Sequence, residues 1–102
     1  MRVHNIEVPR DRIADFCRRH HIRRLAFFGS VLRDDFRPDS DIDVLVEFEP
    51  QHVPGFIGLY DLETELSTLL GGHRVDLVTR GFLNRRIRQR VLADAEVAYA
   101  EG

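Results

Sequence analysis

The sequence predicts a small α/β domain in which helices pack on a mixed sheet of three or four strands. Segments with a strand pattern alternate with segments whose apolar residues recur at helical spacing. The connection between the second and third predicted strands contains a full helix, which is typical of a parallel crossover. The chain has 102 residues, 43% of them hydrophobic, which suits one domain with a modest core. We therefore expect a single domain over residues 1–102.

The N-terminal segment is expected to be a polar lead-in over residues 1–8, followed by a helix. Pro9 is tolerated at a helix start, and three apolar residues recur after it at helical spacing: Ile13, Phe16 and Cys17. The helix is expected to end near His20 and His21. Adjacent helical side chains do not face each other, so we interpret these histidines as partners of the helix dipole rather than as a metal pair.

The middle of the chain predicts strand, turn, short helix, loop and strand. The strand over residues 23–28 has an apolar run, Leu25 to Phe28, that stops at Gly29-Ser30. Residues 30–36 suit a short helix, and residues 41–48 suit a second strand with the apolar run Val44 to Val46. Because side chains alternate along a strand, one face of the second strand is expected to join the core. It carries Ile42, Val44, Val46 and Phe48.

The C-terminal half predicts a helix, a strand, a helix and a short edge strand. Residues 56–70 have a leucine stripe and end at Gly71-Gly72, a favoured helix stop. Residues 74–78 suit a third strand, residues 84–95 a helix and residues 96–99 an edge strand. The arginines of the last helix are expected to form a solvated or partner-facing surface.

Charge and cysteine content exclude several classes of protein. The formal net charge is −2, so no global basic field attracts nucleic acid. All 15 basic residues are arginine, which excludes a Walker-A phosphate loop because that loop needs its lysine. A single cysteine, Cys17, excludes an internal disulfide and fits a cytoplasmic protein. No segment resembles a signal peptide or a membrane span.

Two carboxylates at the start of the second strand suggest a metal site. Asp41 and Asp43 are two residues apart, so they point to the same face of the strand. Two such charges about 4 Å apart repel by roughly 4 kcal/mol at an effective dielectric constant of 20. A divalent cation reverses that repulsion, and Mg²⁺ prefers carboxylates together with water and phosphate oxygens. Glycine in the preceding turn permits close backbone approach, and Ser30 is expected at a helix N-cap, where free N–H groups favour an anion.

Two short motifs lie ten residues apart, Gly29-Ser30 and Asp41-Ile42-Asp43. Together they resemble the signature of the polymerase-beta-like nucleotidyltransferase superfamily. The wider string GSVLRDDFRPDSDIDVLVEF is similar to the minimal nucleotidyltransferases (MNT), small proteins often paired with a HEPN-domain protein. The resemblance covers nearly the whole chain and implies the small nucleotidyltransferase fold, with an antiparallel pairing of the first two strands.

The resemblance also implies roles for individual residues. Asp41 and Asp43, with Asp76 on the third strand, would hold two Mg²⁺ ions, and Gly29 and Ser30 would hold the phosphates of ATP. Arg33 would contact a nucleotide phosphate; a local salt bridge to a loop aspartate is the alternative. For Asp76 the alternative is an ion pair with Arg74 or another arginine.

The implied reaction is transfer of AMP from ATP to an acceptor hydroxyl. A chain of 102 residues has no room for a domain that holds a small acceptor, so a macromolecular acceptor is expected. Proteins similar to this one act as antitoxins that adenylylate a tyrosine of a HEPN toxin. Two alternatives remain: an antitoxin that neutralises its partner by binding alone, and an RNA-directed nucleotidyltransferase. The charge and the absence of aromatic residues among the C-terminal arginines argue against a nucleic-acid partner. A homo- or hetero-oligomer stays open.

Overall fold

A four-stranded mixed sheet organises the computed structural model, which describes the backbone of residues 2–3, 6–32, 37, 39–79 and 85–101. The strand order is β5-β4-β3-β6. The strands are β3 (Ile22–Phe28), β4 (Ile42–Phe48), β5 (Val75–Thr79) and β6 (Glu96–Ala100). β3 runs antiparallel to β4 and to β6, whereas β4 and β5 are parallel. The mixed sheet, the antiparallel first pair, the parallel crossover and the short edge strand are all confirmed.

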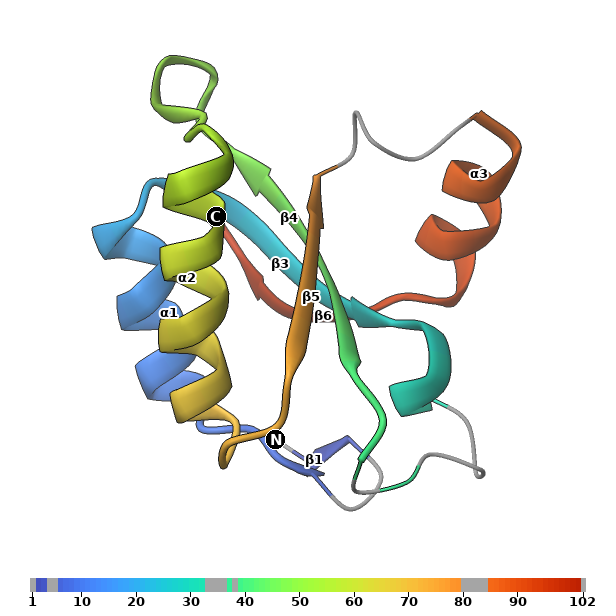
Figure 1. Ribbon diagram of the computed structural model, residues 1–102. Helices are drawn as coiled ribbons and strands as arrows, with labels where there is room; N and C mark the ends of the chain where they lie inside the picture. The colour runs from blue at the N-terminus through green and yellow to red at the C-terminus, as the bar shows by residue number, and fades with distance from the viewer. Residues whose placement is uncertain (1, 4–5, 33–36, 38, 80–84, 102) are drawn as a thin grey trace.

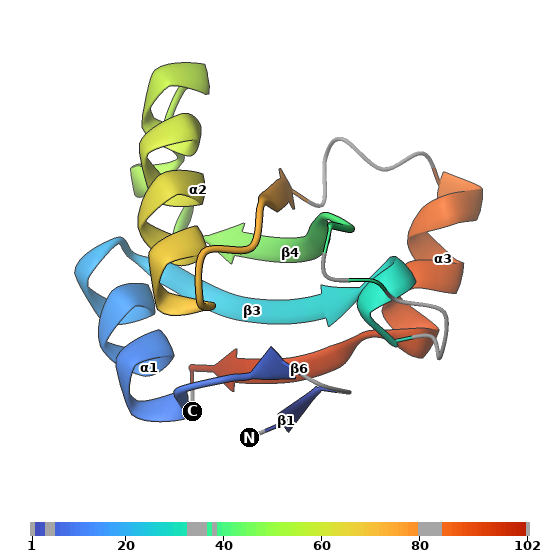
Figure 2. The ribbon, with the colours of Figure 1, turned by 60° about the horizontal axis from the view of Figure 1, so that its bottom comes forward.

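The helices lie on both sides of this sheet. α1 (Arg10–Arg19) and α2 (Phe56–Leu69) lie side by side on one side, and α3 (Arg85–Asp94) lies on the other (Figures 1 and 2). α2 provides the crossover between β4 and β5. Gly71 and Gly72, both with positive φ, end α2, as the sequence predicts, because glycine adopts this conformation without a Cβ clash.

The core lies between the sheet and the pair α1–α2. On β4 the alternating residues Ile42, Val44 and Val46 are fully buried, which confirms the predicted core face. They pack in one cluster with apolar side chains of the two helices: Ile13, Phe16, Cys17, Leu62 and Leu66. Burying such side chains contributes about 1.5–3 kcal/mol each relative to exposure. Any polar residue between them on β4 therefore points to the opposite side of the sheet.

The expectation of a polar lead-in over residues 1–8 is wrong. β1 (Arg2–Val3) and β2 (Ile6–Glu7) pair antiparallel in a small second sheet. Val3, Ile6 and Val8 are buried and belong to the main core cluster. Each strand has only two residues and is too short to show a periodic pattern. The polar residues between the apolar ones therefore led to the prediction of a polar segment.

The predicted helix over residues 30–36 is also different in the structure. A single 3₁₀ turn, η1 (Gly29–Leu32), follows β3, and residues 33–36 lie outside the described part of the chain. Ser30 therefore lies within this turn rather than at the N-cap of an α-helix. A second 3₁₀ turn, η2 (Pro50–His52), lies in the predicted loop before α2.

The exposed face of α2 carries several large apolar side chains. Leu62 and Leu66 are buried as the leucine stripe predicts, but Phe56, Ile57 and Tyr60 are exposed. None of the helices in the described part of the chain has the length and apolar character needed to cross a membrane.

Candidate active site beside Gly29, Asp43 and Asp76

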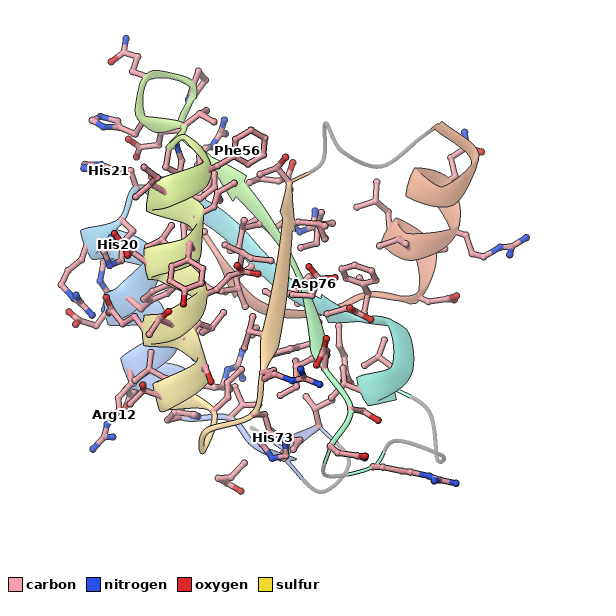
Figure 3. All side chains as sticks on the ribbon, viewed as in Figure 1. Arg12, His20, His21, Phe56, His73 and Asp76 are labelled. Atoms are coloured by element: carbon pink, nitrogen blue, oxygen red, sulfur yellow. The ribbon has the colours of Figure 1, made fainter. Side chains whose placement is uncertain are left out.

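Two of the three predicted aspartates lie on adjacent strands, and the third, Asp41, directly precedes β4. Asp43 on β4 is the register partner of Asp76 on the parallel strand β5, and paired strands lie about 4.8 Å apart. Asp43 and Asp76 alternate with the buried residues Val44 and Leu77, so both belong to the face turned away from the apolar core cluster. Figure 3 shows Asp76 on β5 beside β4. Asp43 is half-buried, while Asp41 and Asp76 are exposed.

Gly29 lies directly against the Asp43 carboxylate. β3 ends at Phe28, which pairs with Asp43 across the antiparallel ladder, and Gly29 then turns with φ +77°. A Cβ at position 29 would overlap the Asp43 carboxylate, with the nearest carboxyl carbon at 3.2 Å. Only a glycine satisfies both the positive φ and this close approach. The turn and Asp43 therefore lie in contact, although Asp43 follows Gly29 by 14 positions in sequence.

Arg74 contacts Asp41 rather than Asp76 among the interactions that the structure describes. The Arg74 Nε atom lies 3.1 Å from Asp41 Oδ1, and the Arg74 side chain is 80% exposed. The Ile42 N–H also donates to the Arg74 carbonyl at 2.8 Å. An ion pair this exposed contributes little, about 0–1 kcal/mol, so it holds Asp41 only weakly.

Glu63 of α2 positions the strand that carries Asp76. β5 lies at the edge of the sheet, and an edge strand presents backbone groups that lack a ladder partner. The Leu77 N–H donates to the Glu63 Oε2 atom at 2.9 Å. Leu77 directly follows Asp76, so this hydrogen bond holds the backbone at the site.

A cavity of about 490 Å³ opens beside Gly29, between η1 and α3. Phe28, Leu32 and Val91 give it apolar walls, and Arg90 and Asp94 add charge. Its volume lies within the range of small-ligand pockets, about 300–1,000 Å³. Sequence reasoning missed Arg90 as a site residue, because it treated the arginines of this helix as one surface. Only the tertiary packing places one of them beside the turn.

A second depression, of about 530 Å³, lies along the edge of β5 against α2. Asp41 and Asp76 line it together with Tyr60 and Glu63. Asp41 and Asp76 are therefore accessible from the α2 side, whereas Gly29 lines the cavity on the α3 side.

The remaining predicted residues fall at the margins of the site. Arg33 lies outside the described residues. The Ser40 Oγ atom accepts a hydrogen bond from the Arg37 N–H at 3.3 Å, so it satisfies a backbone group of the loop before β4. The Cys17 thiol is buried in the core, and this burial raises its pKa to about 12 despite a small lowering by Arg18. Cys17 is therefore unsuited to nucleophilic chemistry, which needs the thiolate.

Known proteins with similar sequences and folds share this arrangement of elements. A family profile described as a nucleotidyltransferase domain matches residues 10–98. The protein adenylyltransferase MntA of Thermococcus cleftensis is 41% identical over 81 residues, which cover 79% of this chain and 77% of the relative.

Two solved toxin–antitoxin structures contain the same fold. A chain from a complex with AMP-PNP has a TM-score of 0.72 and 21% identity, covering 90% of this chain and 73% of the solved one. A chain from the tri-AMPylated Shewanella oneidensis HEPN toxin in complex with MNT antitoxin has a TM-score of 0.64 and 22% identity, covering 89% and 69%. The profile match spans both the glycine turn and the aspartates, and this chain therefore belongs to the nucleotidyltransferase domain family.

Proposed function

We propose that this nucleotidyltransferase moves AMP from ATP to a hydroxyl group, that of a tyrosine, on a partner HEPN toxin and so acts as an antitoxin. One observation supports the chemistry above all others. Asp43 and Asp76 are register partners on adjacent strands, Asp41 directly precedes β4, and Gly29 approaches the Asp43 carboxylate more closely than any other residue type allows.

The donor set of this site fits magnesium. Three carboxylates on or directly before two adjacent strands would provide the oxygen ligands that Mg²⁺ prefers, together with water and phosphate oxygens. Asp41, Asp43 and Asp76 would hold the ions. Two bound Mg²⁺ ions would supply Lewis acidity at the triphosphate and lower the pKa of the acceptor hydroxyl.

The chain's own residues orient the reactants. Gly29 and Ser30 lie in the turn where the triphosphate would rest, and the absence of a Cβ at Gly29 lets the Asp43 carboxylate lie directly against that turn. The acceptor oxygen forms a bond to the α-phosphorus while the bond between the α-phosphorus and the bridging oxygen breaks. Pyrophosphate leaves with that oxygen, and the hydroxyl proton passes to the Asp76 carboxylate.

The two depressions suit different reactants, ATP on the α3 side and the acceptor hydroxyl on the α2 side. The cavity beside Gly29 has apolar walls for a base and the Arg90 guanidinium for an anionic group. The depression along β5 exposes Asp41 and Asp76 beside Tyr60. ATP would therefore enter from the α3 side, and the acceptor hydroxyl from the α2 side.

The comparisons support a HEPN toxin as the acceptor. The Thermococcus relative is named as a protein adenylyltransferase. One structural neighbour contains an AMPylated HEPN toxin with its MNT antitoxin, and another contains AMP-PNP.

The direct test incubates the purified chain with ATP, MgCl₂ and a HEPN-domain protein encoded beside it. Mass spectrometry of the intact partner should show added AMP units, located on tyrosine by fragmentation. The double variant Asp41→Ala with Asp43→Ala should abolish the addition, and chelation of magnesium by EDTA should do the same.

An unmodified partner in the presence of the intact chain, ATP and MgCl₂ would contradict the proposed acceptor. Calorimetry of the chain alone with ATP then separates two cases. Magnesium-dependent ATP binding would leave the site in place and reject only the HEPN acceptor. No such binding would reject the proposed site itself. Parallel incubation with labelled ATP and total RNA tests the RNA-directed alternative.

A further inference from the structure

A second cluster of metal-binding side chains lies at the other end of the β3–β4 pair. His21 precedes β3, Glu49 follows β4, and His52 ends η2. The two strands are antiparallel, with Ile22 paired to Phe48, so these flanking residues meet. Six residues of β3 separate this end from Phe28, which corresponds to about 20 Å. The cluster is therefore distinct from the aspartate site.

The backbone holds the three residues together. The Glu49 N–H donates to the His21 carbonyl at 2.9 Å, and the His52 N–H donates to the Glu49 carbonyl at 2.9 Å. His21 has φ +59°, which is uncommon for a residue with a side chain. This turn directs His21 away from its sequence neighbour His20, whose Nε2 atom lies 3.1 Å from Glu65 Oε1.

The side chains place three donor atoms at one point on the surface. Glu49 Oε2 lies 3.5 Å from His21 Nδ1 and 3.9 Å from His52 Nε2. One ligand atom from each of the three residues lies within 4.8 Å of the others. All three side chains are 40–46% exposed, so an ion can reach them from solvent.

We infer that His21, Glu49 and His52 form a binding site for a divalent transition-metal ion such as Zn²⁺. Two imidazole nitrogens and one carboxylate suit zinc, nickel or copper, whereas Mg²⁺ prefers oxygen ligands alone. Zinc accepts three protein ligands with water in the fourth position, at about 2.0–2.2 Å. The ion would join the α1–β3 turn to the segment that leads into α2.

Binding requires one imidazole to turn. The rings of His21 and His52 are stacked, with centroids 3.7 Å apart and an interplanar angle of 9°. A ligand nitrogen points its lone pair within the plane of its ring, so parallel rings do not converge on one ion. His52 lies on an exposed three-residue turn, and its ring can rotate toward the shared carboxylate. Zinc binding should therefore break the stacking.

The test is calorimetric titration of the full, untagged chain with ZnCl₂, in MgCl₂ sufficient to occupy the carboxylate site. We expect one equivalent of zinc to bind saturably. Imidazole NMR signals of His21 and His52 should shift together as the rings separate, while those of His20 should not. Thermal unfolding should move to higher temperature with zinc, because a ligand that binds only the folded state stabilises it.

Matched variants assign the site. His52→Ala, Glu49→Gln and His21→Asn should each weaken zinc binding by more than about tenfold, and asparagine tolerates the positive φ at position 21. His20→Gln removes the adjacent imidazole and should leave binding unchanged. Should His21→Asn fail to fold, His52→Ala decides the matter, because its side chain is exposed.

Absence of saturable zinc binding would overturn the inference, as would affinity that is equal in the parent and in His52→Ala. Binding lost in His20→Gln would also overturn it. Zinc binding that persists in Asp41→Ala with Asp43→Ala supports the inference. Binding that disappears in this double variant assigns the ion to the aspartates and overturns it. The result is independent of AMP transfer.

Discussion

At the scale of single residues, Gly29 has the most constrained position. Its φ of +77° resembles the +79° of Gly71, but the two glycines differ in their surroundings. A Cβ at position 29 would overlap Asp43, whereas a Cβ at position 71 would meet nothing within 4 Å. A comparison of substitutions at Gly71 and Gly29 therefore distinguishes the cost of backbone strain alone from the cost of strain with steric overlap.

Substituting each glycine by alanine measures the two effects. Gly71→Ala should lower the free energy of unfolding by about 1–2 kcal/mol through strain alone and retain AMP transfer. Gly29→Ala should lower it further and abolish transfer, because the new methyl group displaces the Asp43 carboxylate. Urea unfolding and partner AMPylation provide the two readouts. Equal transfer rates in both variants would contradict the assigned role of Gly29.

Asp76 permits a second prediction at this scale. Asp76→Asn should leave magnesium-dependent ATP binding largely intact, since Asp41 and Asp43 remain, but lower the transfer rate by about a hundredfold or more. Calorimetry measures the binding and mass spectrometry the rate. Asp39→Asn, the same change in an exposed loop residue, is the control and should behave like the parent. Loss of ATP binding in Asp76→Asn would contradict this prediction and assign Asp76 to nucleotide binding instead of to the acceptor hydroxyl.

At the scale of elements, Glu65 links α1 to α2. Its Oε2 atom accepts a hydrogen bond from Arg19 Nη2 at 2.6 Å, and its Oε1 atom lies 3.1 Å from His20 Nε2. Partial burial, the largest single influence, acts to raise the pKa of Glu65, but the hydrogen bonds to Arg19 and His20 together lower it. The net effect is a lowered pKa, so the Glu65 carboxylate stays ionised at a lower pH than an ordinary glutamate does.

This lowered pKa of Glu65 predicts a pH dependence of stability. The folded protein holds the Glu65 proton more weakly than the unfolded chain does. The ionised Glu65 therefore makes its full contribution to the free energy of unfolding above the ordinary pKa of 4.5. This contribution is lost as the pH falls through the folded-state value. The pair is substantially exposed, so the effect should be a few tenths of a kcal/mol, about the value of a surface pair.

Urea unfolding of the parent and of Glu65→Gln between pH 7 and pH 3 checks this prediction. The difference in free energy of unfolding between the two proteins should shrink as the pH falls below about 4.5. Glu101→Gln removes an exposed carboxylate from the Arg23 pair and serves as the control. A difference that grows toward low pH would contradict the assignment.

At the scale of the whole molecule, the question is whether the partner is neutralised by AMP transfer or by binding alone. Asp41 and Asp76 lie at one end of the sheet and line the depression on the α2 side, whereas Gly29, which lies against Asp43, lines the cavity on the α3 side. A neutral, isosteric change at Asp43 should therefore alter chemistry without removing the surface that a partner contacts. This makes the antitoxin activity separable from partner association.

We expect Asp43→Asn to lose protection of cells from the HEPN partner while it still copurifies with that partner. Growth after co-expression measures protection, and affinity purification measures association. Asp39→Asn is again the matched control and should protect. Full protection by Asp43→Asn without partner AMPylation would favour the non-catalytic antitoxin.

The sequence alone determined the elements and the polarity of each strand face. Alternation along residues 41–48 separates the buried valines from the aspartates, and helical spacing after Pro9 identifies the buried face of α1. These patterns are local, because a residue's direction follows from its position within the element. The apolar residues of the first eight positions escaped this reasoning, since two-residue strands are shorter than any period.

The tertiary structure decided which distant residues meet. The register of β4 with β5 places Asp43 beside Asp76, the packing of α3 brings Arg90 to Gly29, and the antiparallel pairing of β3 with β4 joins His21 to Glu49 and His52. Spacing along a chain does not encode such contacts, because they depend on how whole elements bury their apolar faces against one another.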